Sequence, residues 1–288
     1  MNSLFTHTSA WWTRYSDYQW KKAPDGRLYL LPTADATPRP YNMLSDPKQL
    51  VLDAVGVGQI CMKKASTRTE RMEAIKGFTC QYGLMGIMTA LPTTAKFVEY
   101  NQVYLPKNEM FREEVMDTIP YMKHFFPFNM PEFKKHGMES LWNLSDRTMI
   151  ALAMTFQDVP QAVSMSFMRD YGERYDWLEA VFRGFAFGLT AAFLYELDKD
   201  DASPQTIQLY NAGLAGFDDN APSYHLTLQG KPQMVWDFHS LLLCVKLLFS
   251  TMLTDDDHPL RMCRKCRKAF VAESIDQHIC DKCSFTGH

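Results

Sequence analysis

Apolar residues recur at helical spacing in two long segments of the chain. In residues 173–198 they stand three and four positions apart, and only Glu196 interrupts the apolar stripe. Residues 234–253 repeat this spacing, while their polar residues lie on the other faces. Such a stripe is typical of a helix with one face in a protein core. We therefore predict two core helices with these buried side chains: Leu178, Phe182, Phe185, Leu189, Phe238, Leu241, Val245 and Leu248.

The N-terminal part has a different pattern. Residues 11–35 contain two short β-prone runs on either side of Pro24-Asp25-Gly26, which is a turn signal. This pattern predicts a hairpin. The prolines in residues 32–46 break regular structure and predict a surface connection there.

Helical spacing dominates from Asp46 onward, and Pro47 occupies a plausible first helical position. Residues 69–91 predict a second helix, which Pro92 ends. Residues 106–131 combine four prolines with an aromatic run, so we expect short helices and turns with the aromatic rings packed inside. Residues 199–232 predict a loop with one strand from Tyr224 to Leu228.

These patterns together predict a mainly α fold in three parts. Residues 1–45 would form the N-terminal hairpin and connection, residues 46–254 a helical body, and residues 255–288 a zinc knuckle. With 288 residues and 46% hydrophobic content, the chain can bury a sizeable core.

The net charge and the absence of targeting signals indicate which partners and which cellular location to expect. The formal net charge is -3 and the pI is about 6.2, so any contact with nucleic acid must be local. The N-terminus has neither a basic start nor a continuous apolar run, which predicts a cytoplasmic protein. The most apolar runs, Gly184 to Leu197 and Leu241 to Leu253, are shorter than the roughly 20 residues that span a bilayer. We expect no membrane insertion.

The seven cysteines divide into two groups. Cys61, Cys80 and Cys244 lie singly in apolar helical patterns, as small buried hydrophobic residues do. The other four form two CxxC pairs, Cys263 with Cys266 and Cys280 with Cys283. Two such pairs present four thiolates to one tetrahedral ion, and this predicts a Zn²⁺ site. Disulfide pairing and replacement of one cysteine by His278 are the alternatives.

The residues around this predicted site suggest what the site does. Phe270, with Val271 and Ile279, could pack against the metal ligands as a very small core. Four cysteines leave no open coordination position, so the ion would be structural and not catalytic. The first CxxC pair carries a basic run that could bind phosphate groups, although nearby acidic residues could pair with it instead. This run comprises Arg261, Arg264, Lys265, Arg267 and Lys268.

The order of parts resembles that of bacterial CGNR zinc-finger proteins, which are regarded as transcription regulators. The resemblance rests on Phe270 and the four cysteines, together with the helical region that precedes them. After Cys283 the chain reads Ser284-Phe285-Thr286, which differs from the Gly-Asn-Arg ending of that family. The resemblance implies a DNA-associated regulatory role.

Catalytic motifs give no comparable signal. The chain has no HExxH, GxSxG or P-loop sequence, and the glycines at 56 and 58 lack the rest of a dinucleotide-binding fingerprint. We therefore expect a binding function, although dispersed catalytic residues would escape this search. The preferred hypothesis is a cytoplasmic zinc protein that binds DNA or RNA as a regulator. The alternative is a protein-interaction or assembly component, for example of a mobile element or defence system, with a purely structural zinc.

Overall fold

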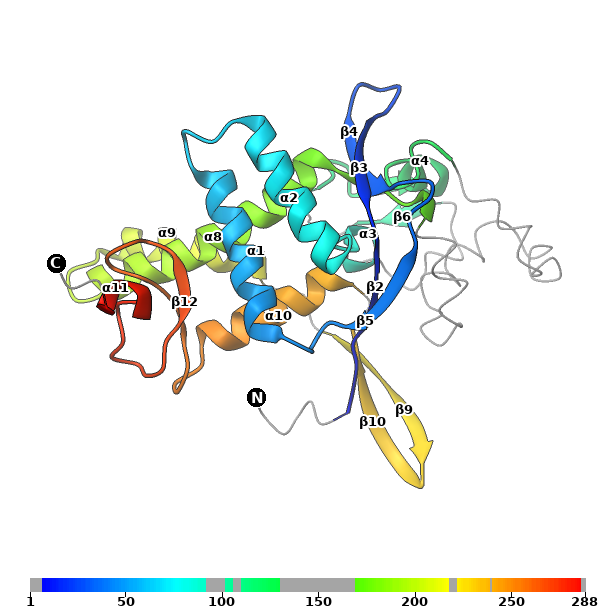
Figure 1. Ribbon diagram of the computed structural model, residues 1–288. Helices are drawn as coiled ribbons and strands as arrows, with labels where there is room; N and C mark the ends of the chain where they lie inside the picture. The colour runs from blue at the N-terminus through cyan, green and yellow to red at the C-terminus, as the bar shows by residue number, and fades with distance from the viewer. Residues whose placement is uncertain are drawn as a thin grey trace. The chain divides into compact units, whose positions relative to one another are not determined.

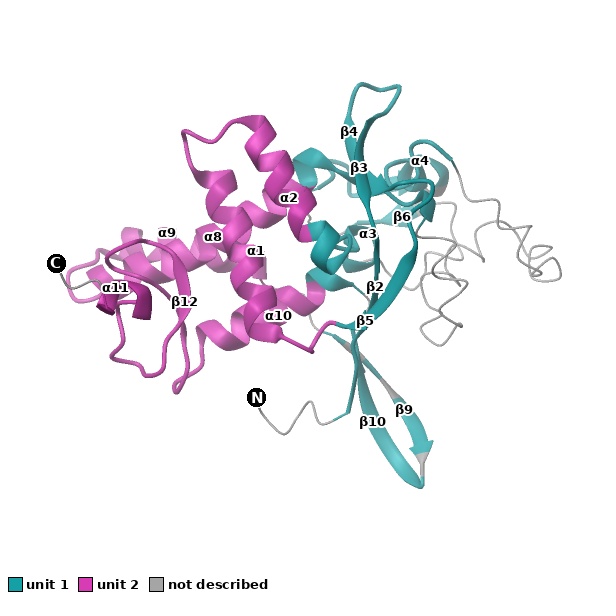
Figure 2. Ribbon diagram, in the orientation of Figure 1, with its two compact units in different colours: residues 1–42, 79–177, 222–242 teal, residues 43–78, 178–221, 243–288 magenta. Residues whose placement is uncertain are grey.

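The computed structural model describes residues 7–91, 102–105, 110–129, 169–217, 222–238 and 240–285. The chain divides into two compact units (Figure 2), each assembled from three stretches of sequence. Unit 1 consists of Met1–Asn42, Thr79–Trp177 and Pro222–Leu242, and unit 2 of Met43–Phe78, Leu178–Ala221 and Leu243–His288. The predicted division after residues 45 and 254 stays a prediction.

The prediction of a mainly α fold is wrong. Helix makes up 45% and strand 21% of the structure, and the strands form several small sheets (Figure 1). The prediction failed mainly because the strands of these small sheets are short. Each strand leaves only a few residues that alternate between apolar and polar in the sequence. Most of the described strands belong to unit 1.

The predicted N-terminal hairpin is confirmed in unit 1. Strands β3 (Tyr18–Lys22) and β4 (Leu28–Pro32) pair antiparallel, and Gly26 in the turn has φ 82°. Strand β8 (Glu173–Arg174) adds to β4. The expected surface connection instead contains strand β5 (Pro38–Asn42), which pairs with β2 (Trp11–Tyr15). Its prolines fit because this two-stranded sheet consists of edge strands, in which outward positions need no N–H donor.

A second three-stranded sheet of unit 1 is built on a hairpin near residue 230. Strands β9 (Ser223–Gln229) and β10 (Lys231–Asp237) pair antiparallel, and β1 (Thr8–Ser9) lies parallel to β10. The strand expected at Tyr224 to Leu228 is thereby confirmed. The helix expected from Met234 begins later, since α10 covers Leu241–Leu253.

The helix expected over residues 69–91 is also interrupted. Helix α2 (Arg68–Tyr82) ends before Gly83 and Gly86, whose φ values of 90° and 71° belong to the left-handed region that favours glycine. A four-residue helix, α3 (Ile87–Ala90), follows.

A buried carboxylate stabilises this break. Glu173 is fully buried in unit 1 and accepts hydrogen bonds from the backbone N–H groups of Met85 and Ile87 and from the Tyr171 hydroxyl, each at 2.8 Å. Burial raises the pKa of Glu173 above its ordinary value, although these donors favour the ionised form. The three donors satisfy a polar group that would otherwise be costly to bury.

The aromatic run in residues 106–131 packs inside unit 1 where it is described. Tyr121, in helix α4 (Thr118–Lys123), and the two following rings Phe125 and Phe126 are buried. The short strands β6 (Gln102–Tyr104) and β7 (Val115–Asp117) pair beside this segment in the sequence. The expectation of interior packing is confirmed for these three rings.

Unit 2 has a helical core. It contains α1 (Pro47–Met62), most of α8 (Tyr175–Asp198), α9 (Pro204–Leu214) and most of α10. Helix α1 begins as predicted, with Asp46 as its N-cap and Pro47 in the first turn. Within α1, a Cβ atom on Gly58 would lie 2.1 Å from the carbonyl oxygen of Phe182. Gly58 therefore serves the close approach of two helices, whereas a Cβ atom on Gly56 would meet nothing within 4 Å.

The eight core side chains predicted from helical spacing are all buried. In unit 2 the Phe182 ring meets Phe78 edge-on at a centroid distance of 4.9 Å, and Phe185 meets Phe249 at 5.6 Å. Cys61 and Cys244 are buried as expected, and Cys80 is half-buried.

Helix α8 is long enough, and apolar enough, to cross a membrane. Half of its most apolar 18-residue window is nevertheless buried within the protein. Core helices of water-soluble folds share these properties, so length and composition do not distinguish the two settings here.

Truncation of a core side chain should measure how much these helices contribute to stability. We expect Phe182→Ala or Leu241→Ala to lower the free energy of unfolding by about 2–5 kcal/mol, because each side chain is fully enclosed. Urea titration followed by circular dichroism measures the change. Leu209→Ala is the matched control, because Leu209 is 63% exposed in α9 and should change stability by less than about 0.5 kcal/mol. Equal effects for all three variants would contradict the packing assignment.

Candidate metal centre

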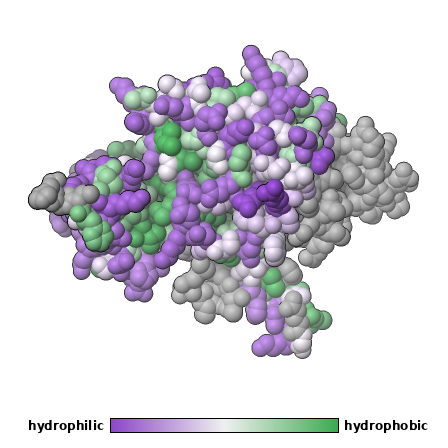
Figure 3. Space-filling model, viewed as in Figure 1, coloured by the Kyte–Doolittle hydropathy of each residue, from purple (hydrophilic) through white to green (hydrophobic). Residues whose placement is uncertain are grey.

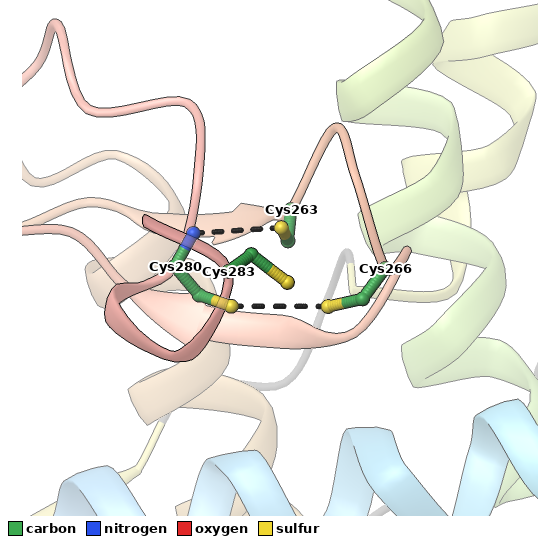
Figure 4. Close-up of side chains that lie close together, drawn as sticks. All are labelled: Cys263, Cys266, Cys280 and Cys283. Carbon is green, nitrogen blue, oxygen red and sulfur yellow. Dashed lines mark hydrogen bonds between the residues drawn. The ribbon is translucent and has the colours of Figure 1, made fainter. Parts of the chain in front are cut away.

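The four predicted cysteines lie together in unit 2. Their Sγ atoms are all within 4.8 Å of one another, and this group could hold a metal ion. Figure 4 shows the sulfur atoms facing a common centre. Cys263 is buried, Cys266 is exposed, and Cys280 and Cys283 are half-buried. All four are free thiols, so no disulfide links them.

Two short strands and a tight turn position the first pair. Strands β11 (Leu260–Met262) and β12 (Ala269–Val271) are antiparallel, and Cys263 and Cys266 lie in the turn between them. The Cys263 N–H donates to Lys268 O, and the Arg267 N–H donates to Cys263 O, each at 2.9 Å. Arg267 has φ 63°, a left-handed conformation that costs energy for a residue other than glycine. This turn brings the two sulfur atoms of the pair to one side.

A helical turn positions the second pair. Cys280 immediately precedes the five-residue helix α11 (Asp281–Phe285), and its carbonyl accepts from the N–H groups of Cys283 and Ser284 at 2.9 and 3.0 Å. The Arg264 N–H donates to His278 O at 3.0 Å and so ties the two turns together. The Cys280 N–H also lies 3.4 Å from the Cys263 sulfur.

The thiols influence one another's ionisation. Burial acts to raise the pKa of Cys263, but N–H groups of Cys266, Cys280 and Lys265 directed at its sulfur outweigh burial and lower it to about 6. A hydrogen bond with Cys266, together with burial, raises the pKa of Cys283 to about 12. One thiolate therefore forms readily and the next are opposed. Like charges this close oppose one another's ionisation, so binding of a cation would let more of these thiols ionise and would release their protons.

The module of residues 260–285, here called the knuckle, docks on α8 through one carboxylate. Glu196 Oε1 lies 2.5 Å from Arg261 Nη1 and 3.1 Å from His278 Nδ1. Arg264 Nη2 is 3.9 Å from the same oxygen. The Arg261 side chain is only 13% exposed, so its charge is compensated within the protein.

Two further contacts fix the knuckle to the helices of unit 2. The Arg267 guanidinium carbon lies 4.9 Å from the centroid of the Phe193 ring of α8. The Gln59 side-chain amide of α1 donates to Arg267 O at 2.8 Å. This bond stabilises the turn at the residue that has the left-handed backbone.

The structure places the other predicted site residues as follows. Arg264, Lys265, Arg267 and Lys268 are exposed, whereas Arg261 is not. The acidic run at 255–257 lies in an exposed turn, where Asp255 accepts from the N–H groups of Asp257 and His258. These bonds lower the pKa of Asp255.

The small apolar core expected around the site is built differently. Phe270 and Val271 are only half-buried and Ile279 is 39% exposed. The buried residues are instead Leu260, Met262, Cys263 and Ala272. His278 is not in the four-cysteine group and contacts Glu196.

Glu196 and Gln59 were not predicted to belong to this site. For Glu196 a signal existed, because it is the single charged residue in the apolar stripe of α8. A lone carboxylate on such a stripe indicates a nearby cation, although it does not identify which one. Gln59 is an uncharged polar residue among the apolar residues of α1 and gave no sign of a distant partner.

The geometry establishes four clustered thiols that could bind a metal ion. No family model, curated protein or solved structure matches the chain. The function proposed below therefore depends on the residues of this site.

Removal of the Glu196 charge should loosen the knuckle without removing the metal ligands. In Glu196→Gln we expect faster hydrogen exchange in residues 260–285, because Arg261 loses its charged partner, and a loss of about 1–3 kcal/mol in stability. Hydrogen exchange with mass spectrometry measures the first effect and urea titration the second. Glu113→Gln, at an exposed residue of unit 1, is the matched control. Unchanged exchange in the Glu196 variant would contradict the docking role.

Proposed function

We propose that Cys263, Cys266, Cys280 and Cys283 bind one Zn²⁺ and that the resulting knuckle binds nucleic acid through its exposed basic residues. The observation that carries this proposal is that the four Sγ atoms lie within 4.8 Å of one another. A tetrahedral zinc site with bonds of about 2.3 Å has sulfur atoms separated by roughly 3.8 Å. The Sγ atoms of Cys266 and Cys280 are 3.8 Å apart.

Zinc is the ion that best fits this donor set. Four thiolates prefer a soft or borderline ion, and a closed tetrahedral site with no water position is typical of structural zinc. Metal binding would also supply the folding energy that so small a module lacks. The ion would hold the two turns together and take no part in catalysis.

The basic face supports nucleic-acid binding. Arg264, Lys265, Arg267 and Lys268 are exposed and stand next to the first cysteine pair. Clustered cations of this kind attract phosphate groups even on a protein whose net charge is -3. The resemblance of the cysteine pattern to CGNR zinc-finger proteins supports a regulatory role at DNA, and the free cysteines suit a reducing cytoplasm.

A second candidate is an assembly component with a structural zinc. It is favoured by the contacts of Arg261, Arg264 and Arg267 with side chains of α8. Arg261 and Arg264 face Glu196, and Arg267 lies on Phe193. In this case the basic residues would mainly attach the knuckle to its own helices.

Loss of one cysteine should remove the metal. Protein purified without chelator should contain about one zinc per chain, and Cys280→Ser should contain almost none, because three thiolates bind the ion far more weakly. Inductively coupled plasma mass spectrometry measures the content. Cys244→Ser is the control, because Cys244 is buried in α10 outside the four-cysteine group. The helical core of unit 2 should survive in Cys280→Ser, with its circular dichroism retained. Wild-type protein without metal would refute the zinc site.

Removal of the exposed basic residues should separate the two candidate functions. For Arg264→Ala/Lys265→Ala/Arg267→Ala/Lys268→Ala we expect weaker binding to mixed DNA and RNA and a smaller salt dependence, since each lost phosphate contact lowers the salt slope by about 0.9 on duplex DNA. Fluorescence anisotropy over a salt series measures both quantities.

The matched control removes four positive charges elsewhere, in Lys48→Ala/Lys63→Ala/Lys64→Ala/Lys199→Ala, whose side chains are all exposed. Zinc content must be equal in all proteins compared. If the two variants bind alike, the basic face does not bind nucleic acid, and the assembly role is favoured.

A further inference from the structure

The hairpin of β9 and β10 carries an exposed apolar face. Tyr224, Leu226 and Leu228 of β9 are 61%, 73% and 81% exposed, and Met234 of β10 is 40% exposed. The register places Met234 opposite Leu226 and Trp236 opposite Tyr224, so these residues share one face of the hairpin. Figure 3 shows hydrophobic surface on this hairpin. Exposed apolar residues gathered in this way are typical of interaction surfaces.

Strand β9 also lies at an edge of its sheet among the described strands. In the sheet of order β1, β10, β9, it pairs only with β10 among the described strands. An edge strand presents unpaired N–H and C=O groups, and proteins usually protect such edges with lysine, proline or a bulge. The seven residues of β9 contain no proline and no acidic residue, lysine or arginine. This edge is therefore suited to pair with another strand.

The sequence of β9 is symmetric in polarity about Leu226. Apolar residues stand two positions away on each side, at Tyr224 and Leu228. The positions one and three away are uncharged polar residues or histidine, namely Ser223, His225, Thr227 and Gln229. An antiparallel pair of two β9 strands centred on Leu226 would therefore place apolar residues opposite apolar ones and no like charges opposite each other.

We propose that two copies of this chain associate through β9, antiparallel and centred on Leu226. A two-fold interface must be self-complementary, because each residue meets its symmetry-related partner patch. The polarity pattern of β9 meets this condition, and the pairing would join two three-stranded sheets into one. Tyr224 of one copy would then lie opposite Leu228 of the other, and each side chain would cover part of the other's exposed apolar surface.

The first test measures association of the full chain. Sedimentation equilibrium of the wild type should show a monomer–dimer equilibrium, and Leu226→Lys should weaken it by at least about tenfold, because two like charges would face each other at the symmetry axis. Leu209→Lys is the matched control, since it places the same charge on another exposed leucine and should leave association unchanged. A monomeric wild type at all concentrations, or equal effects of both variants, would overturn the proposal.

The second test examines the register. In the proposed pairing the two copies of residue 226 face each other at about 4.5–5.5 Å between Cα atoms, within the range of a disulfide. The two copies of residue 228 would lie four positions apart, about 14 Å along the strands. Leu226→Cys should therefore form covalent dimers under mild oxidation, and Leu228→Cys should not exceed the wild type, whose native cysteines set the background. Equal cross-linking of both variants would exclude this register, and with it the proposed interface. Retained circular dichroism confirms that the variants fold.

Discussion

The knuckle is too small to hold itself together, and its contacts follow from this constraint. Residues 260–285 bury only a few side chains, among them Leu260, Cys263 and Ala272. A module of this size needs a metal, a disulfide or a neighbouring surface to fold. The cysteines offer the first, and Glu196 with Phe193 offers the last. The metal would fix the two turns to each other, while α8 fixes the module to unit 2.

The contacts that hold the knuckle on α8 also determine which positive charges of the basic run are available for a partner. Glu196 compensates Arg261, whose side chain is largely enclosed, so that cation serves the fold. Arg264 is 44% exposed and lies 3.9 Å from the same carboxylate oxygen, at a distance where exposed ion pairs contribute little. A phosphate group could therefore attract Arg264 at little cost. Under the proposed function, structural and binding roles would divide along the basic run according to burial, which sequence spacing alone does not reveal.

A feature of this structure could be predicted from the sequence when the residues that form it lie close together along the chain. The cluster of four cysteines could be predicted because each CxxC pair is local, and the core residues of α8 because helical periodicity extends over many turns. The sequence pattern predicts a helix from Met234, over the end of strand β10, since Met234 and Phe238 are spaced as on a helix and only the pairing with β9 decides between the two. The contact of Glu196 with Arg261 joins residues 65 positions apart and has no local signal beyond a lone charge.

Association through β9 would raise the affinity for nucleic acid that a weakly binding basic face can provide. A dimer carries two knuckles, whatever the placement of the units, and two weak phosphate-binding sites on one particle act together when a single nucleic-acid strand can reach both. The second contact then forms at the effective concentration set by the first, so the observed affinity exceeds that of either site. Few cations per chain can therefore suffice for a protein with net negative charge, since long-range repulsion between the body and the nucleic acid is screened within roughly 8 Å at physiological salt. The apolar hairpin and the basic knuckle would thus both determine the affinity for nucleic acid. The hairpin would set the number of binding sites on each particle, and the knuckle would set the strength of each site.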